Sequence, residues 1–152
     1  MTVFLLILSM SFKGAEVPFT IIETGFFVEE PVQAVVRTTA EWAGLFEQFT
    51  VPTEIGMLEY PPTFPSFVDF DTGMLIIVGL GKSTDVGAGN NPSVSIDSLM
   101  LRNDSLFVHY TTSVPDEGAF CTAGGFVYPS CMAVVERTGA VPVFIPTSGS
   151  GM

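Results

Sequence analysis

The chain alternates short apolar segments with turn residues along most of its length. Segments rich in β-branched and aromatic residues, bounded by Gly, Pro, Asn and Asp, are typical of β-strands. The expected strands are residues 19–27, 32–37, 67–70, 74–80, 93–101, 106–112, 132–137 and 140–145. The pattern therefore predicts a mainly β protein, an antiparallel sandwich or partly open barrel of about seven to nine short strands.

Three of these segments carry more specific signals. The stretch MLIIVGL at 74–80 is apolar on both faces, so we expect a central strand that is covered on both sides. Strands 93–101 and 106–112 flank a short polar turn and predict a hairpin. The last two strands, on either side of Thr138-Gly139, predict a second hairpin.

One short helix is predicted at about residues 39–49. Thr38 and Glu41 fit a capping box, in which the Thr hydroxyl accepts a hydrogen bond from the Glu amide and the carboxylate reaches back. Apolar residues follow at i, i+3, i+4 and i+7, namely Trp42, Leu45, Phe46 and Phe49. We expect this stripe to lie on a sheet and Trp42 to be buried.

Composition narrows the class of protein. A chain of 152 residues with 47% hydrophobic and 14% charged residues is too apolar for intrinsic disorder and fits one domain. The net charge is −11 with only five Lys and Arg, which excludes a nucleic-acid binder. No apolar run reaches the ~18 residues of a spanning helix. We expect a single domain at 19–146 and a flexible tail at 147–152.

The N-terminus and the cysteines bear on location. Residues 1–18 fit either a truncated signal segment or a first strand, since Val3 to Leu8 is apolar, and no Cys follows for a lipid anchor. Cys121 and Cys131 are the only cysteines, and their even count and short separation favour a disulfide. Two free thiols, or a metal or nucleophile role, are the alternatives. A disulfide would indicate a secreted, periplasmic or cell-surface protein.

Candidate chemistry is sparse, and the sequence predicts no catalytic, cofactor-binding or metal-binding residue. Asp69 and Asp71 suit either calcium or plain solvation. His109, the only histidine, lies mid-strand, where a role on the sheet face is more common than catalysis. Gly81-Lys82-Ser83 resembles the end of a phosphate loop, but the pattern lacks its first Gly and a following helix.

The order of several motifs is similar to that of a known family. They are the Trp42-Ala-Gly-Leu-Phe46 helix, the segment Pro65-Ser-Phe-Val-Asp-Phe70, the strand Met74 to Gly79, and Tyr128-Pro129 before a strand. Together they resemble the PrcB C-terminal-like family across roughly residues 20–145. The loop at 81–92 is longer than the family's short aromatic turn. The resemblance implies a β-domain of the cell envelope that associates with a subtilisin-like protease and supports it, with no catalytic residues carried over.

The predicted function is therefore a non-enzymatic binding domain with a protein partner. Candidate partner-binding residues are Tyr60, Phe64, Phe126 and Tyr128, and the expected structural residues are Trp42, Leu45, Phe46, Phe49, Asp69 and Phe70. Asp69 is expected to cap a turn or pair with an amide. The alternatives are a small enzyme or ligand carrier that uses carboxylates on a β-scaffold, and a structural or adhesion module of a surface assembly.

Overall fold

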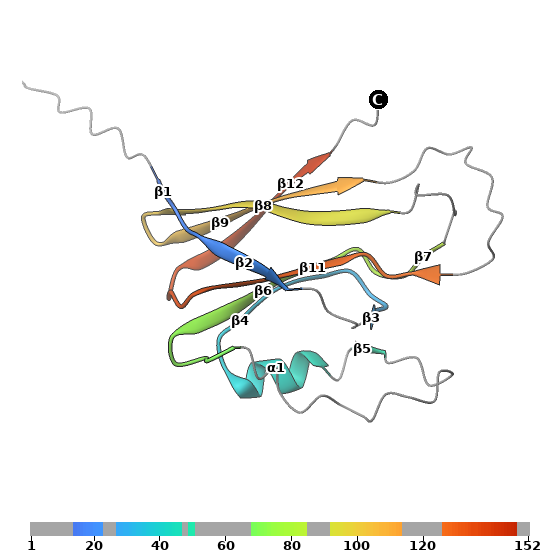
Figure 1. Ribbon diagram of the computed structural model, residues 1–152, viewed down its shortest axis with the longest axis horizontal. Coiled ribbons are helices and arrows are strands. Elements are labelled where there is room, and N and C mark those ends of the chain that lie inside the picture. The colour runs from blue at the N-terminus through green and yellow to red at the C-terminus, as the bar shows by residue number, and fades with distance from the viewer. Residues whose placement is uncertain are drawn as a thin grey trace, which may run out of the picture.

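The computed structural model describes residues 14–22, 27–46, 49–50, 68–84, 92–113 and 126–148. Two four-stranded sheets face each other, and one helix covers the outer side of one of them, so the molecule has three layers (Figure 1). The sheets are not closed into a barrel, and the predicted mainly β sandwich with one short helix is confirmed.

The strands divide evenly between the two sheets. Sheet A has the order β1 (Ala15–Glu16), β8 (Ser93–Arg102), β9 (Ser105–Ser113) and β12 (Val141–Ser148). Sheet B has the order β2 (Phe19–Ile22), β11 (Ser130–Glu136), β6 (Gly73–Gly79) and β4 (Val32–Val36). Two small ribbons pair β3 (Phe27–Val28) with β5 (Phe49–Thr50), and β7 (Ser83–Thr84) with β10 (Phe126–Val127).

Strand β6 is central and buried on both faces, as its continuous apolar sequence predicts. Met74, Ile76 and Val78 point between the sheets, whereas Leu75 and Ile77 point toward the helix. Each of these side chains is at most 1% exposed. The strand lies between β11 and β4, so both of its edges are also paired.

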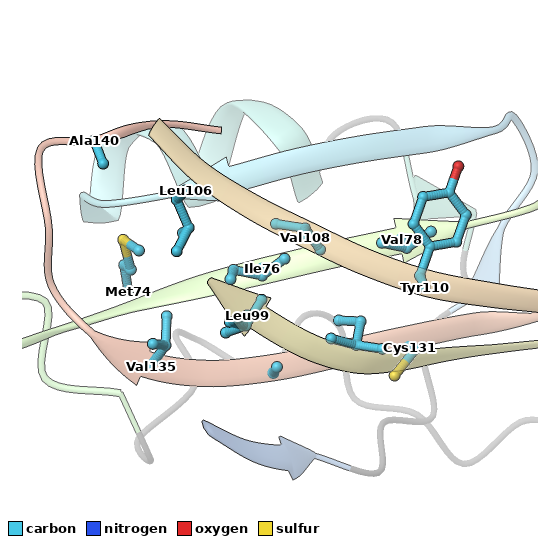
Figure 2. Close-up of a cluster of buried hydrophobic side chains, with 12 residues drawn as sticks. Met74, Ile76, Val78, Leu99, Leu106, Val108, Tyr110, Cys131, Val135 and Ala140 are labelled. Carbon is cyan, nitrogen blue, oxygen red and sulfur yellow. The ribbon is translucent and has the colours of Figure 1, made fainter. Parts of the chain in front are cut away.

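The main core fills the space between the two sheets. Alternate residues of β6, β8, β9 and β11 meet there, and Figure 2 shows Met74 and Ala140 at one end of this cluster and Tyr110 and Cys131 at the other. A smaller cluster lies on the other face of sheet B, where Trp42, Val68 and Phe70 pack with Leu75 and Ile77.

The helix α1 (Thr39–Phe46) begins at the predicted cap. The Glu41 amide donates to Thr38 Oγ1 over 3.1 Å, and a Glu41 carboxylate oxygen accepts from the Arg37 amide over 2.6 Å. The carboxylate thus reaches one residue further back than in a strict capping box. Trp42 is buried with 4% of its surface exposed, and Leu45 packs beside it.

Three predicted bounds are wrong. The tail predicted from residue 147 starts two residues too early, because Thr147 and Ser148 still pair with β9 as part of β12. The helix ends at Phe46, and Phe49 lies in β5, where it pairs with Val28, so it does not extend the helical stripe. The segment predicted as a strand at 67–70 is not one over its described residues 68–70. These residues lead into the turn before β6, because the Asp69 carbonyl accepts two amides of that turn.

The first predicted hairpin is confirmed. Strands β8 and β9 pair antiparallel from Ser93↔Ser113 to Arg102↔Ser105. The turn holds Asn103 at a φ of 53°, a left-handed conformation that Asn tolerates better than most residues. A β-bulge between Ile96 and Ser98 interrupts the register.

The second predicted hairpin is wrong, because β11 and β12 lie in different sheets. After Glu136 the chain crosses from sheet B to sheet A, where β12 pairs in parallel with β9. The crossing is held by Arg37, whose guanidinium donates to the Thr138 carbonyl over 2.9 Å and to the Ala140 carbonyl over 2.6 Å. These bonds come from the end of β4, about a hundred residues earlier, and leave no local sequence signal.

The chain also changes sheets at its N-terminal edge. Strands β1 and β2 follow each other as one extended segment that runs from the layer of sheet A to the layer of sheet B (Figure 1). The Val17 amide still donates to the Leu99 carbonyl of sheet A, whereas Phe19 already pairs with Val135 of sheet B.

Candidate binding surfaces

The predicted partner-binding residues are only partly within the described structure. Tyr60 and Phe64 lie outside the described residues. Phe126 belongs to the short strand β10, which pairs with β7, but its side chain is not among those described. Tyr128 is half-buried and lies between β10 and β11 in the chain. The shared partner surface of these four residues therefore stays a prediction.

Cys131 is a buried free thiol in the structure, whereas Cys121 lies outside the described residues. The disulfide between them stays a prediction. Burial raises the pKa of the Cys131 thiol and the negative charge of Asp97 adds to this, while a backbone hydrogen bond from Ile96 opposes it. A buried thiol with a raised pKa is a poor nucleophile at neutral pH.

Asp69 shapes the turn that precedes β6. Its Oδ1 accepts the Asp71 amide over 3.0 Å, and its carbonyl accepts the amides of Thr72 and Gly73. Both aspartates are exposed. Within the described ranges, no group of three or more His, Cys, Asp or Glu residues is placed to hold a metal ion.

The remaining candidates occupy structural positions. His109 lies half-buried on the outer face of sheet A, opposite Ser98. Gly81 has a left-handed φ of 81°, and a Cβ there would come within 2.8 Å of the Glu29 carbonyl. The left-handed backbone and the lack of room for a Cβ therefore explain the glycine at position 81. Its likeness to a phosphate-loop glycine needs no further explanation.

The sandwich has an opening on the side of β4. A cavity of about 460 Å³ is lined by residues of β4, β6 and β9, including Gln33, Gly79 and Tyr110. The Gln33 side-chain amide donates to the Tyr110 hydroxyl over 2.7 Å and so bridges the two sheets. These two polar groups at the opening are thus engaged with each other.

A second opening lies on the opposite side, between β2 and β8. Its cavity of about 350 Å³ is lined mainly by apolar side chains, and by Ser95, Ser130 and Cys131. Ile21 borders it and is 47% exposed, one of three exposed large hydrophobic residues within the described ranges. Nothing in the sequence around Ile21 marks it as a surface residue, because FTII has the composition of an ordinary buried strand.

Comparisons with protein-family models, with curated proteins and with solved structures find no significant match to this chain. In the described ranges, no helix is both long and apolar enough to cross a membrane.

Proposed function

We propose that this protein is a non-enzymatic binding domain of the secreted or cell-envelope kind, and that it associates with a subtilisin-like protease and supports it. The partner class comes from the resemblance of its motif order to the PrcB C-terminal-like family. The observation that carries the binding role is the apolar opening beside Ile21. Such an opening suits a protein segment, because apolar surface and backbone edges recognise extended chains.

The test is complex formation between the purified full-length chain and the subtilisin-like protease encoded nearest to it, with the protease nucleophile changed from Ser to Ala. Size-exclusion chromatography with light scattering should show a species whose mass is the sum of the two. A subtilisin-like protease from an unrelated source is the control and should elute separately. Separate elution of the cognate pair at micromolar concentrations would overturn the protease assignment.

The proposed secreted or cell-envelope location can be tested through the two cysteines. In an oxidising compartment we expect Cys121 and Cys131 to be paired, so denatured but unreduced protein from its native source should take up no iodoacetamide. Two adducts in the intact mass would remove the cysteine argument for a secreted or envelope protein.

A further inference from the structure

The two sheets differ at the edge where β1 and β2 lie. In sheet B, β2 pairs with β11 from Met132 to Val135. In sheet A, β1 pairs with β8 only at Met100 and Leu101, and Val17 adds one hydrogen bond at Leu99 before the chain leaves for sheet B. Among the described strands, residues 93–98 of β8 therefore pair only with β9. We call this open position beside residues 93–98 the edge slot.

The side chain of Ile21 indicates that the slot is a gap in the sandwich. Ile21 pairs with Ala133, which is fully buried between the sheets, so Ile21 faces the same interior side. Phe19, on the same face, packs against the core. Ile21 nevertheless stays 47% exposed, because no described strand of sheet A lies opposite it. A strand in the edge slot would cover it and close the cavity of about 350 Å³.

The backbone of β8 offers hydrogen bonds toward the slot. The Val141 amide of β12 binds the Asp104 carbonyl, so alternate residues of β9, including Tyr110 and Thr112, face β12. Ile96 and Val94 lie opposite these two residues, and their amides and carbonyls consequently face away from β9. The Ile96 backbone makes a hydrogen bond to the Cys131 thiol. A thiol is a weak hydrogen-bond partner, so a backbone carbonyl of an added strand could take its place.

The opposite edge of sheet A is protected from such pairing. Val141 faces β9, so the backbone groups of Pro142 and Pro146 face outward. Proline lacks an amide hydrogen, and prolines on an edge discourage a further strand. The stretch Ser93–Ile96 of β8 contains no proline, and the bulge at Ile96/Ser98 limits the regular edge to these four residues.

The negative charge near the edge slot indicates which side chains a bound strand would carry. Asp97 is exposed on the outer face at the end of this edge, where the hydroxyls of Ser95 and Thr111 donate to its carboxylate. The residues that line the cavity include no charged side chain of either sign, and the whole chain carries −11. The outward side chains of an added strand would therefore lie near the Asp97 carboxylate on a chain of negative net charge, while its inward side chains would meet apolar residues such as Ile21 and Val94.

We propose that the edge slot binds an extended segment of a partner protein, about four residues long, with apolar side chains pointing inward alternating with Lys or Arg pointing outward. The segment would add to β8 as an edge strand. This inference rests on the proposed binding function and assigns it a surface and a recognition mode.

The first test uses three eight-residue peptides with the full-length chain in reducing buffer, so that Cys131 is a thiol. One alternates Val and Lys, the second alternates Val and Glu, and the third is the Val/Lys peptide with alternate amides N-methylated. In NMR titrations the Val/Lys peptide should shift and protect the amides of Val94 and Ile96. The Val/Glu peptide should bind at least about fivefold more weakly, and the N-methylated peptide should not bind.

A pair of variants tests the position. Ile21→Ser should weaken binding of the Val/Lys peptide about five- to tenfold, through the lost apolar contact. Val141→Ser is the matched control, since Val141 is 63% exposed on the protected edge, and it should change nothing. Both positions are exposed, so both variants should fold.

Several outcomes would overturn the inference. They are no binding of the Val/Lys peptide, equal binding by Ile21→Ser, a Val94 amide that is already protected in the free monomer, and a dimer that Ile21→Ser dissolves. The last two would mean that the chain itself, or a second copy, fills the slot. If the cognate protease binds wild type and Ile21→Ser equally, the proposed function stands and the slot fails. If the peptide binds but the protease does not, the slot stands and the protease assignment fails.

Discussion

Single side chains stabilise this fold at positions where two layers meet. Trp42 is the clearest case, since it is the only Trp in the chain and the helix presents it to the outer face of sheet B. It packs there in one cluster with Val36, Leu75 and Ile77. The helix therefore reaches this second cluster through Trp42, with Leu45 packed against it.

Replacing Trp42 by Ala should lower the free energy of unfolding by about 3–5 kcal/mol, because it leaves a large cavity under the helix. Chemical denaturation followed by circular dichroism is the suitable measurement, since the variant has no Trp fluorescence. Ala43→Ser, at an exposed position of the same helix, is the control and should change stability by less than about 0.5 kcal/mol. An unchanged midpoint for Trp42→Ala would show that the second cluster contributes little.

Burial in the core lowers the reactivity of the Cys131 thiol. In the reduced protein, burial raises the pKa of the Cys131 thiol, so less thiolate forms at a given pH than in the unfolded chain. Alkylation of Cys131 by iodoacetamide should therefore be slow in the folded protein and should rise at a higher pH than in denaturant. Peptide mapping by mass spectrometry can follow this site separately. Equal rates in the folded and denatured protein would contradict the buried position.

At the scale of elements, the two crossings between the sheets define the topology. One is the change from β1 to β2 at Val17 and Pro18, and the other is the segment between β11 and β12. Arg37 ties the second crossing to the end of β4, and Arg137 donates to the Phe70 carbonyl over 2.6 Å. Two of the five Lys and Arg residues in the chain thus hold backbone carbonyls near this crossing.

Arg37→Met should destabilise the protein by about 1.5–3 kcal/mol, because two partly buried carbonyls lose a charged donor. Arg102→Met is the matched control, since Arg102 is exposed at the end of β8, and it should cost less than about 0.5 kcal/mol. Thermal unfolding of both variants gives the comparison. An effect of Arg37→Met no larger than that of Arg102→Met would mean that the crossing is stable without the guanidinium.

At the scale of the whole molecule, the chain is strongly acidic, and the charged residues that the structure describes lie outside its core. Within the described ranges, no charged or polar residue is buried, so these charges lie at or near the surface. With a net charge of −11, mutual repulsion opposes the compact state.

Added salt should therefore raise the melting temperature at neutral pH, because it screens this repulsion. Differential scanning fluorimetry across a sodium chloride series measures the effect. The same series near pH 4, close to the sequence pI of about 4.1, is the control, and there the rise should be much smaller. A melting temperature that falls with salt at neutral pH would indicate that attractive ion pairs outweigh the repulsion.

Local sequence determined the elements whose contacts are made with residues close by in the chain. The β8–β9 hairpin needs only two alternating segments around a short turn, and the helix start needs only Thr38 and Glu41. The central place of β6 also follows from its composition, because a strand that is apolar on both faces must be covered on both.

Tertiary structure alone decided where the last strand goes and where the sandwich stays open. The apolar pattern of Val141–Ser148 fits a hairpin with β11 as well as a parallel strand beside β9, and only contacts from Arg37 and the core select the second. The exposure of Ile21 likewise depends on how far β1 extends along β8, a strand about eighty residues later in the chain. Alternation along a strand specifies which side chains share a face, but the neighbours of that face come from distant parts of the chain.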